Sequence, residues 1–129
     1  MIFLELISNT INLNVKGDLI NNSNSTFRVQ NASTNSPIVT INVDGDVTAN
    51  SGIIDLNFAN NGIGTINLKG NLTVASAAQL FANNASTATF NFNGTGDGLS
   101  AATTQTIDVA STNTEKIDFN VKSGAYVQL

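Results

Sequence analysis

Residues 64–71 read GTINLKGN, and the same pattern of residues occurs four more times in the chain. The other copies are INLNVKGD at 11–18, VTINVDGD at 39–46, ATFNFNGT at 88–95 and IDFNVKSG at 117–124. Successive copies lie about 24 to 29 residues apart, within the range of roughly 20 to 50 residues that is typical of solenoids, propellers and arrays. The chain is therefore expected to consist of one repeated structural unit.

The copies alternate strictly between apolar and polar residues when they are aligned on their glycines. The central apolar column contains Leu13, Ile41, Ile66, Phe90 and Phe119. The polar column beside it contains Asn14, Asn42, Asn67, Asn91 and Asn120. Successive side chains of a strand point to opposite faces, so each copy is predicted to be a strand with one buried face. The apolar column should form a core stack, and the asparagines should form an outward ladder along the axis.

Each of these strands ends at a small residue, which predicts a corner because glycine adopts a φ that other residues resist. The corner residues are Gly17, Gly45, Gly70, Gly94 and Ser123. A short inward position follows each corner, at Leu19, Val47, Leu72, Gly96 and Ala125. A further apolar alternation then appears at 27–29, 54–58, 80–81 and 107–109, bounded by Asn, Ser and Gly clusters typical of turns.

One repeat is therefore two or three short strands, with no segment periodic enough for a helix. A propeller blade also uses several strands per repeat, but its repeat is normally about 40 to 50 residues long. The shorter repeat favours an all-β fold: a right-handed parallel β-solenoid (β-helix) of about five coils, with the hand expected from the rule for parallel crossovers. Residues 1–129 are expected to form a single domain, either alone or as a fragment or subunit of a longer fibre.

Composition narrows the classes of function. The net charge is -4 and the few lysines are dispersed, so the chain offers no basic surface for nucleic acid. Cysteine and histidine are absent, which excludes disulfides, thiolate metal sites and a histidine base. The acidic residues are scattered, mostly one per repeat. We therefore expect no enzyme, no catalytic residue and no cofactor.

Three acidic residues near the first two corners are candidate calcium ligands, because Ca²⁺ prefers six to eight oxygen ligands. They are Asp18, Asp44 and Asp46, and the competing interpretation is that they are ordinary turn residues. The string GTGDGL at 94–99 weakly matches calcium-binding nonapeptide repeats, but it occurs once and out of register with the other copies.

The strings TINVDGDVTANSG, GTINLKGNLTVAS and ATFNFNGTGDGLS resemble the passenger regions of bacterial autotransporters and two-partner-secreted adhesins. The resemblance covers most of the chain from about Thr10 onward and rests on the residue pattern of the repeats as a whole. It implies a right-handed parallel β-helix that is secreted, displayed at the cell surface, and adhesive or structural in its role. It implies no catalytic residue.

The expected function is a structural or adhesive element of a bacterial surface appendage or filament. The two ends of the chain, 2–6 and 125–129, are apolar and do not read as capping repeats. Head-to-tail self-association, or continuation within a longer chain, is therefore expected, without membrane insertion. The alternative is a binding module for carbohydrate or ice that uses the Asn ladder and the adjacent Thr40, Thr65 and Thr89.

Overall fold

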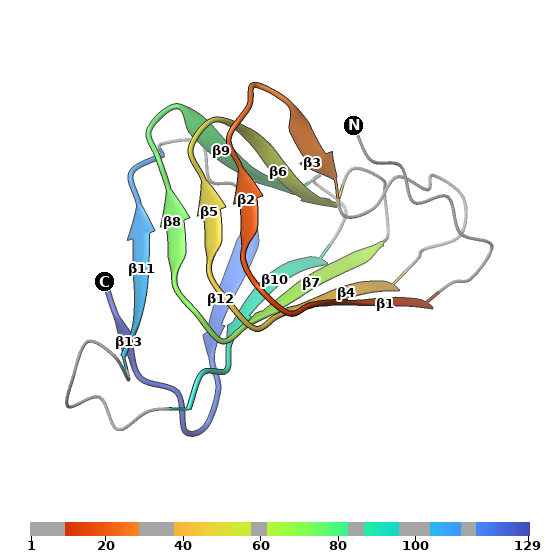
Figure 1. Ribbon diagram of the computed structural model, residues 1–129. Coiled ribbons are helices and arrows are strands. Elements are labelled where there is room, and N and C mark those ends of the chain that lie inside the picture. The colour runs from red at the N-terminus through yellow and green to blue at the C-terminus, as the bar shows by residue number, and fades with distance from the viewer. Residues whose placement is uncertain (1–9, 29–37, 58–61, 83–86, 96–103, 112–115) are drawn as a thin grey trace.

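The computed structural model describes residues 10–28, 38–57, 62–82, 87–95, 104–111 and 116–129. These residues form short β-strands and no helix, and the strands wind around one axis as three parallel sheets (Figure 1). The alternating apolar residues of the strands explain this arrangement, because each strand has one apolar face that must be buried against another sheet.

Each sheet collects the equivalent strands of successive coils. The first sheet contains β1 (Thr10–Val15), β4 (Ile38–Val43), β7 (Ile63–Leu68), β10 (Thr87–Phe92) and β12 (Ile117–Val121). The second sheet contains β2 (Leu19–Asn21), β5 (Val47–Ala49), β8 (Leu72–Val74), β11 (Gln105–Val109) and β13 (Val127–Gln128). The third sheet contains β3 (Thr26–Arg28), β6 (Gly52–Asn57) and β9 (Ala78–Ala82).

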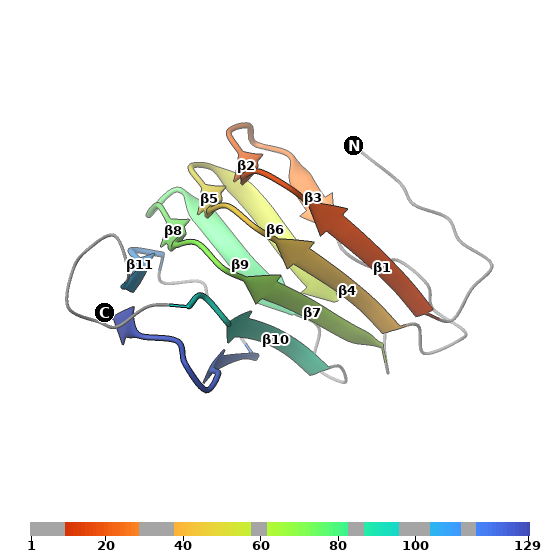
Figure 2. The same cartoon turned by 60° about the horizontal axis from the view of Figure 1, so that its bottom comes forward.

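The repeats of the sequence are also the repeats of the structure. Ile41 pairs with Ile66, and Ile66 pairs with Phe90, so aligned residues of successive copies are neighbours in the first sheet. Figure 2 shows β1, β4, β7 and β10 side by side in this sheet. Seen from the N-terminal end, the chain runs clockwise as it recedes (Figures 1 and 2), which is a right-handed solenoid. The predicted fold class is confirmed.

The number of complete coils is smaller than the five expected. Within the described part of the chain, only three coils have a strand in all three sheets, and the last two contribute β10 with β11 and β12 with β13. One reason lies in the fourth copy. Its segment 107–109 was grouped with 27–29, 54–58 and 80–81, whose described residues belong to the third sheet, but Ile107 pairs with Leu72 in the second sheet. Gly96, expected as the inward residue after that corner, lies outside the described residues.

The core fills the space between the three sheets and is most complete in the middle coils. Ile41, Ile66 and Phe90 are buried, whereas Leu13 and Phe119 at the two ends of the same column are 39% and 38% exposed. The Phe90 and Phe119 rings stack with their centroids 5.9 Å apart. Each middle rung has a neighbour on both sides, and each end rung has one among the described residues, so the end rungs retain exposed apolar surface.

The corner glycines serve close packing, and the φ explanation is wrong for them. Among the described glycines, only Gly52 and Gly124 have a positive φ. A Cβ on Gly70 would collide with the carbonyl oxygen of Gly45 one coil below, whereas a Cβ on Gly17 in the first coil would meet nothing. The corners therefore need glycine because the backbones of successive coils approach closely there.

Candidate functional site

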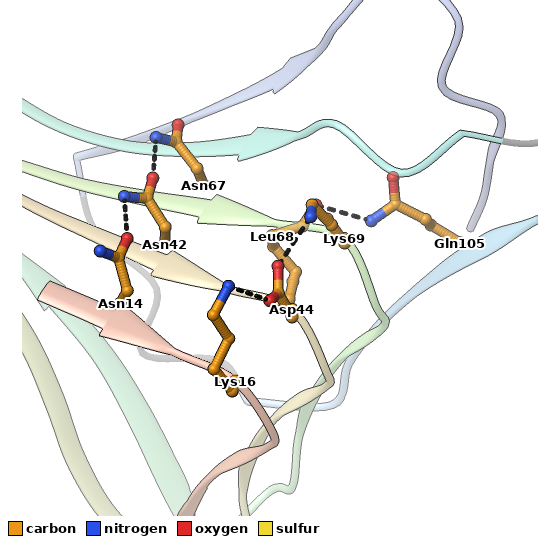
Figure 3. Close-up of polar contacts among 8 residues, drawn as sticks. All are labelled: Asn14, Lys16, Asn42, Asp44, Asn67, Leu68, Lys69 and Gln105. Atoms are coloured by element: carbon orange, nitrogen blue, oxygen red, sulfur yellow. Dashed lines mark hydrogen bonds and ion pairs between the residues drawn. The ribbon is translucent and has the colours of Figure 1, made fainter.

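The outward face of the first sheet carries a continuous ladder of asparagine side chains. Each Nδ2 donates to the Oδ1 of the preceding coil: Asn42 to Asn14 at 2.9 Å, Asn67 to Asn42 at 2.7 Å, Asn91 to Asn67 at 2.8 Å and Asn120 to Asn91 at 3.5 Å. Figure 3 shows Asn14, Asn42 and Asn67 one above the next. Because parallel pairing in register places identical side chains about 4.8 Å apart, the amides satisfy one another.

A charged column runs beside this ladder. The Nζ of Lys16 lies 3.0 Å from Asp44 Oδ2, and the Nζ of Lys69 lies 2.7 Å from Asp44 Oδ1 (Figure 3). Asp44 therefore lies between two lysines from the coils on either side. The hydrogen bonds from Lys69 and Lys16 hold the pKa of Asp44 below its ordinary value. The column continues with the neutral Asn93 and ends with Lys122, which follows β12 directly.

A threonine column lies on the other side of the asparagines. Thr40 pairs with Thr65, and Thr65 pairs with Thr89. All three side chains are half-buried. The column ends at Asn12 on β1 and at Asp118 on β12. We call the outward face formed by the asparagine, charged and threonine columns the ladder face.

The corner carboxylates have a structural role that the sequence does not reveal. Asp18 Oδ1 accepts a hydrogen bond from the backbone N–H of Asp46 at 2.9 Å, and Asp46 Oδ1 accepts one from the N–H of Asn71 at 2.7 Å. Asn71 continues the series, because its Oδ1 accepts from the N–H of Thr106 at 2.8 Å. Each corner side chain thus binds the equivalent backbone group of the next coil.

Each of the three candidate calcium ligands already has a partner within the protein. Asp44 pairs with lysines, and Asp18 and Asp46 each bind a backbone N–H group. In the described ranges, no three residues among His, Cys, Asp and Glu gather into a group that could hold a metal ion. Most of the string GTGDGL lies outside the described residues.

The role of Gln105, a buried residue at the corner of the fourth coil, was missed at the level of the sequence. Its Oε1 accepts from the N–H of Gly94 at 2.8 Å, and its Nε2 donates to the carbonyl oxygens of Leu68 at 3.0 Å and Gly70 at 2.5 Å. Figure 3 shows the contact with Leu68. A usable signal was available: Gln105 shares its parity with the inward-facing Ile107 and Val109, and a buried amide requires hydrogen-bond partners.

Comparison with protein-family models, curated proteins and solved structures finds no match to this chain. A search of the described residues for a helix long and apolar enough to cross a membrane also finds none. Function is therefore inferred from the side chains and hydrogen bonds of the ladder face and of the two ends of the solenoid.

Proposed function

We propose that this chain is a structural or adhesive β-solenoid element of a bacterial surface appendage or filament, extended by end-to-end stacking of coils. In this role the chain is secreted, acts at the cell surface and has no catalytic activity. Parallel backbone pairing and the side-chain ladders both run along the solenoid axis, so many hydrogen bonds share a load applied along that axis. The ladder face repeats the same chemical groups at each rung, which suits multivalent contact.

The exposed ends of the core carry this proposal. Leu13 and Phe119 belong to the column in which Ile66 is fully buried, yet each exposes more than a third of its surface. The strands β1 and β12 also form the two edges of the first sheet. Open edges and exposed apolar side chains together favour pairing with another strand. Additional coils, from a longer polypeptide or from a second copy, would cover both features.

The first experiment is size-exclusion chromatography with negative-stain electron microscopy over a range of protein concentrations. We expect unbranched filaments one solenoid wide, whose length increases with concentration. Electron microscopy of the native surface material should show fibres of the same width. A soluble monomer that persists at high concentration with both edges uncovered would contradict end-to-end stacking.

The regular threonine column supports a second candidate, a carbohydrate- or ice-binding face. Thr40, Thr65 and Thr89 repeat at the strand spacing of about 4.8 Å. Asn67 and Asn91 each donate one of their two amide N–H groups to the asparagine of the preceding rung, so the other is left for a ligand. A glycan array and an ice-recrystallisation assay test this candidate. The variant Thr65→Lys should abolish either activity, whereas Lys116→Glu outside the column should preserve it.

A further inference from the structure

The two edges of the first sheet present equivalent groups. The edge strand β1 offers Leu13 on its inward side, and the edge strand β12 offers Phe119 from the same column. Their exposed fractions, 39% and 38%, are nearly equal. An aligned strand from another molecule would give both residues the second neighbour that Ile66 already has.

The asparagine ladder gives the two edges opposite chemistry. Each of the four hydrogen bonds of the ladder runs from the Nδ2 of the later coil to the Oδ1 of the earlier coil. At the N-terminal edge, Asn14 uses its Oδ1 within the ladder and presents its Nδ2 as a donor. At the C-terminal edge, Asn120 uses its Nδ2 and presents its Oδ1 as an acceptor. A donor meets an acceptor only when unlike edges meet, because contact between two like edges brings donors or acceptors together.

We infer that both edges bind a second copy of this chain, head to tail and in register, with Asn14 of one copy opposite Asn120 of the preceding copy. Leu13 then packs against Phe119 of the preceding copy, and the first sheet continues across the joint with parallel pairing. This inference rests on the proposed function and adds the partner, polarity and register of stacking. Because the contact joins two different surfaces and does not close on itself, it propagates as a filament.

The register has an electrostatic consequence at the joint. Within one copy Asp44 separates Lys16 from Lys69, but Lys122 has the neutral Asn93 as its neighbour in the column. The backbone N–H of Lys122 still donates to the Phe92 carbonyl oxygen at 2.9 Å, so the pairing extends to this residue. Stacking in register therefore brings Lys16 of one copy beside Lys122 of the preceding copy. Like charges at adjacent positions weaken the contact, and salt screens them.

A charge reversal at Lys122 tests this register. The variant Lys122→Glu places an acid beside Lys16 of the next copy, so it should form filaments at a protein concentration roughly 3- to 10-fold lower than the wild type. The matched control Lys116→Glu makes the same change in net charge, but in this register Lys116 lies opposite Thr10, so assembly should stay close to wild type. Added salt should promote assembly of the wild type and weaken that of Lys122→Glu.

Disulfide trapping tests the register independently, because the chain has no cysteine of its own. Positions 14 and 120 lie on opposite edges of the five-stranded sheet, four strand spacings or about 19 Å apart. That distance is too long for a disulfide within one copy. Mild oxidation of the double variant Asn14→Cys/Asn120→Cys should therefore produce a ladder of covalent oligomers. The control Asn14→Cys/Lys122→Cys is displaced by two residues and should produce few.

The outcomes separate this inference from the proposed function. The register would be overturned if Lys122→Glu and Lys116→Glu both assembled like the wild type, or if both cysteine pairs gave equal disulfide ladders. End-to-end stacking would stand in either case. Efficient formation of disulfide-linked dimers by the single variant Asn120→Cys would indicate tail-to-tail contact and overturn the polarity. A monomer in every variant at every concentration would overturn both the register and the stacking.

Discussion

The third and fourth coils turn the same corner in different ways. In the third coil, the N–H of Gly70 donates directly to the carbonyl oxygen of Gly45 at 3.1 Å. In the fourth coil, the equivalent N–H of Gly94 donates to Gln105 Oε1, and Gln105 Nε2 donates to the carbonyl oxygen of Gly70. A carboxamide has the same donor and acceptor as a peptide group. The side chain of Gln105 thus links the backbones of Gly94 and Gly70 at the corner where residues 93–104 separate β10 from β11 in the sequence.

The irregular corner is less completely satisfied than the regular one. At the third-coil corner, Lys69 and Asn71 pair with Asp44 and Asp46 of the preceding coil. At the fourth, Asn93 replaces a charged residue, and its Oδ1 is buried without a hydrogen-bond partner. The comparison teaches that direct backbone hydrogen bonds between coils hold a regular corner, whereas the interrupted corner relies on one side chain for the equivalent contact.

The largest expected effect therefore comes from Gln105→Leu. This change preserves size but leaves the N–H of Gly94 and the carbonyl oxygen of Gly70 without their partner. At about 1–3 kcal/mol for each of these two groups, the free energy of unfolding should fall by roughly 2–6 kcal/mol. Urea unfolding measures it. The matched control Gln128→Leu, at an exposed position of β13, should change stability by less than about 0.5 kcal/mol. Similar losses in both variants would refute the bridging role of Gln105.

A smaller effect is expected when the regular corner is crowded. Gly70→Ala forces a methyl group against the backbone of Gly45, and overpacking of this kind costs about 1–3 kcal/mol. Gly17→Ala meets open space, so it should be neutral or stabilise by up to about 1 kcal/mol through the unfolded state. Thermal unfolding of the two variants compares the same substitution at the same corner position. Equal destabilisation would mean that close approach of the coils is not the reason for glycine.

The corner carboxylates allow a finer test. Asp46→Ala removes the acceptor for the N–H of Asn71 and should cost about 1 kcal/mol. Asp46→Asn should cost only a few tenths, because Asn71 already performs this role for Thr106 with an amide oxygen. Denaturant unfolding distinguishes the two variants. If both lose the same stability, the charge of Asp46 matters and its hydrogen bond does not.

The smallest expected effect on stability concerns Asp44 of the second coil, whose place in the charged column is taken by the neutral Asn93 in the fourth coil. Hydrogen bonds from Lys69 and Lys16 lower the pKa of Asp44, so its ionised form favours the folded state. This stabilisation is fully present above the ordinary Asp pKa of about 3.9 and is lost as pH falls through the lowered value. Unfolding should therefore show wild type slightly more stable than Asp44→Asn at pH 6, with the difference disappearing at lower pH. A difference that persists at pH 2 would contradict this account.

Residues in the regular repeats were the predictable part of this molecule. Period-two alternation was sufficient to place Ile66 inward and Asn67 outward, because pairing in register copies each choice into the next coil. The corner of the fourth coil was not predictable in this way. A copy interrupted after Gly94 gives no indication of where the next strand begins, so 107–109 was grouped with segments of the third sheet although it pairs in the second. The reason for the corner glycines also depended on the separation of two coils, which a single copy does not contain.

The common direction of the asparagine amides also makes the solenoid electrically polar. Each carboxamide in the series from Asn14 to Asn120 is a dipole, and a chain of hydrogen bonds polarises its members, strengthening each bond by roughly 10 to 30%. The donor at one extremity and the acceptor at the other become stronger as the series lengthens. Growth by head-to-tail addition would then be cooperative, since each added copy makes the extremities more receptive to the following one.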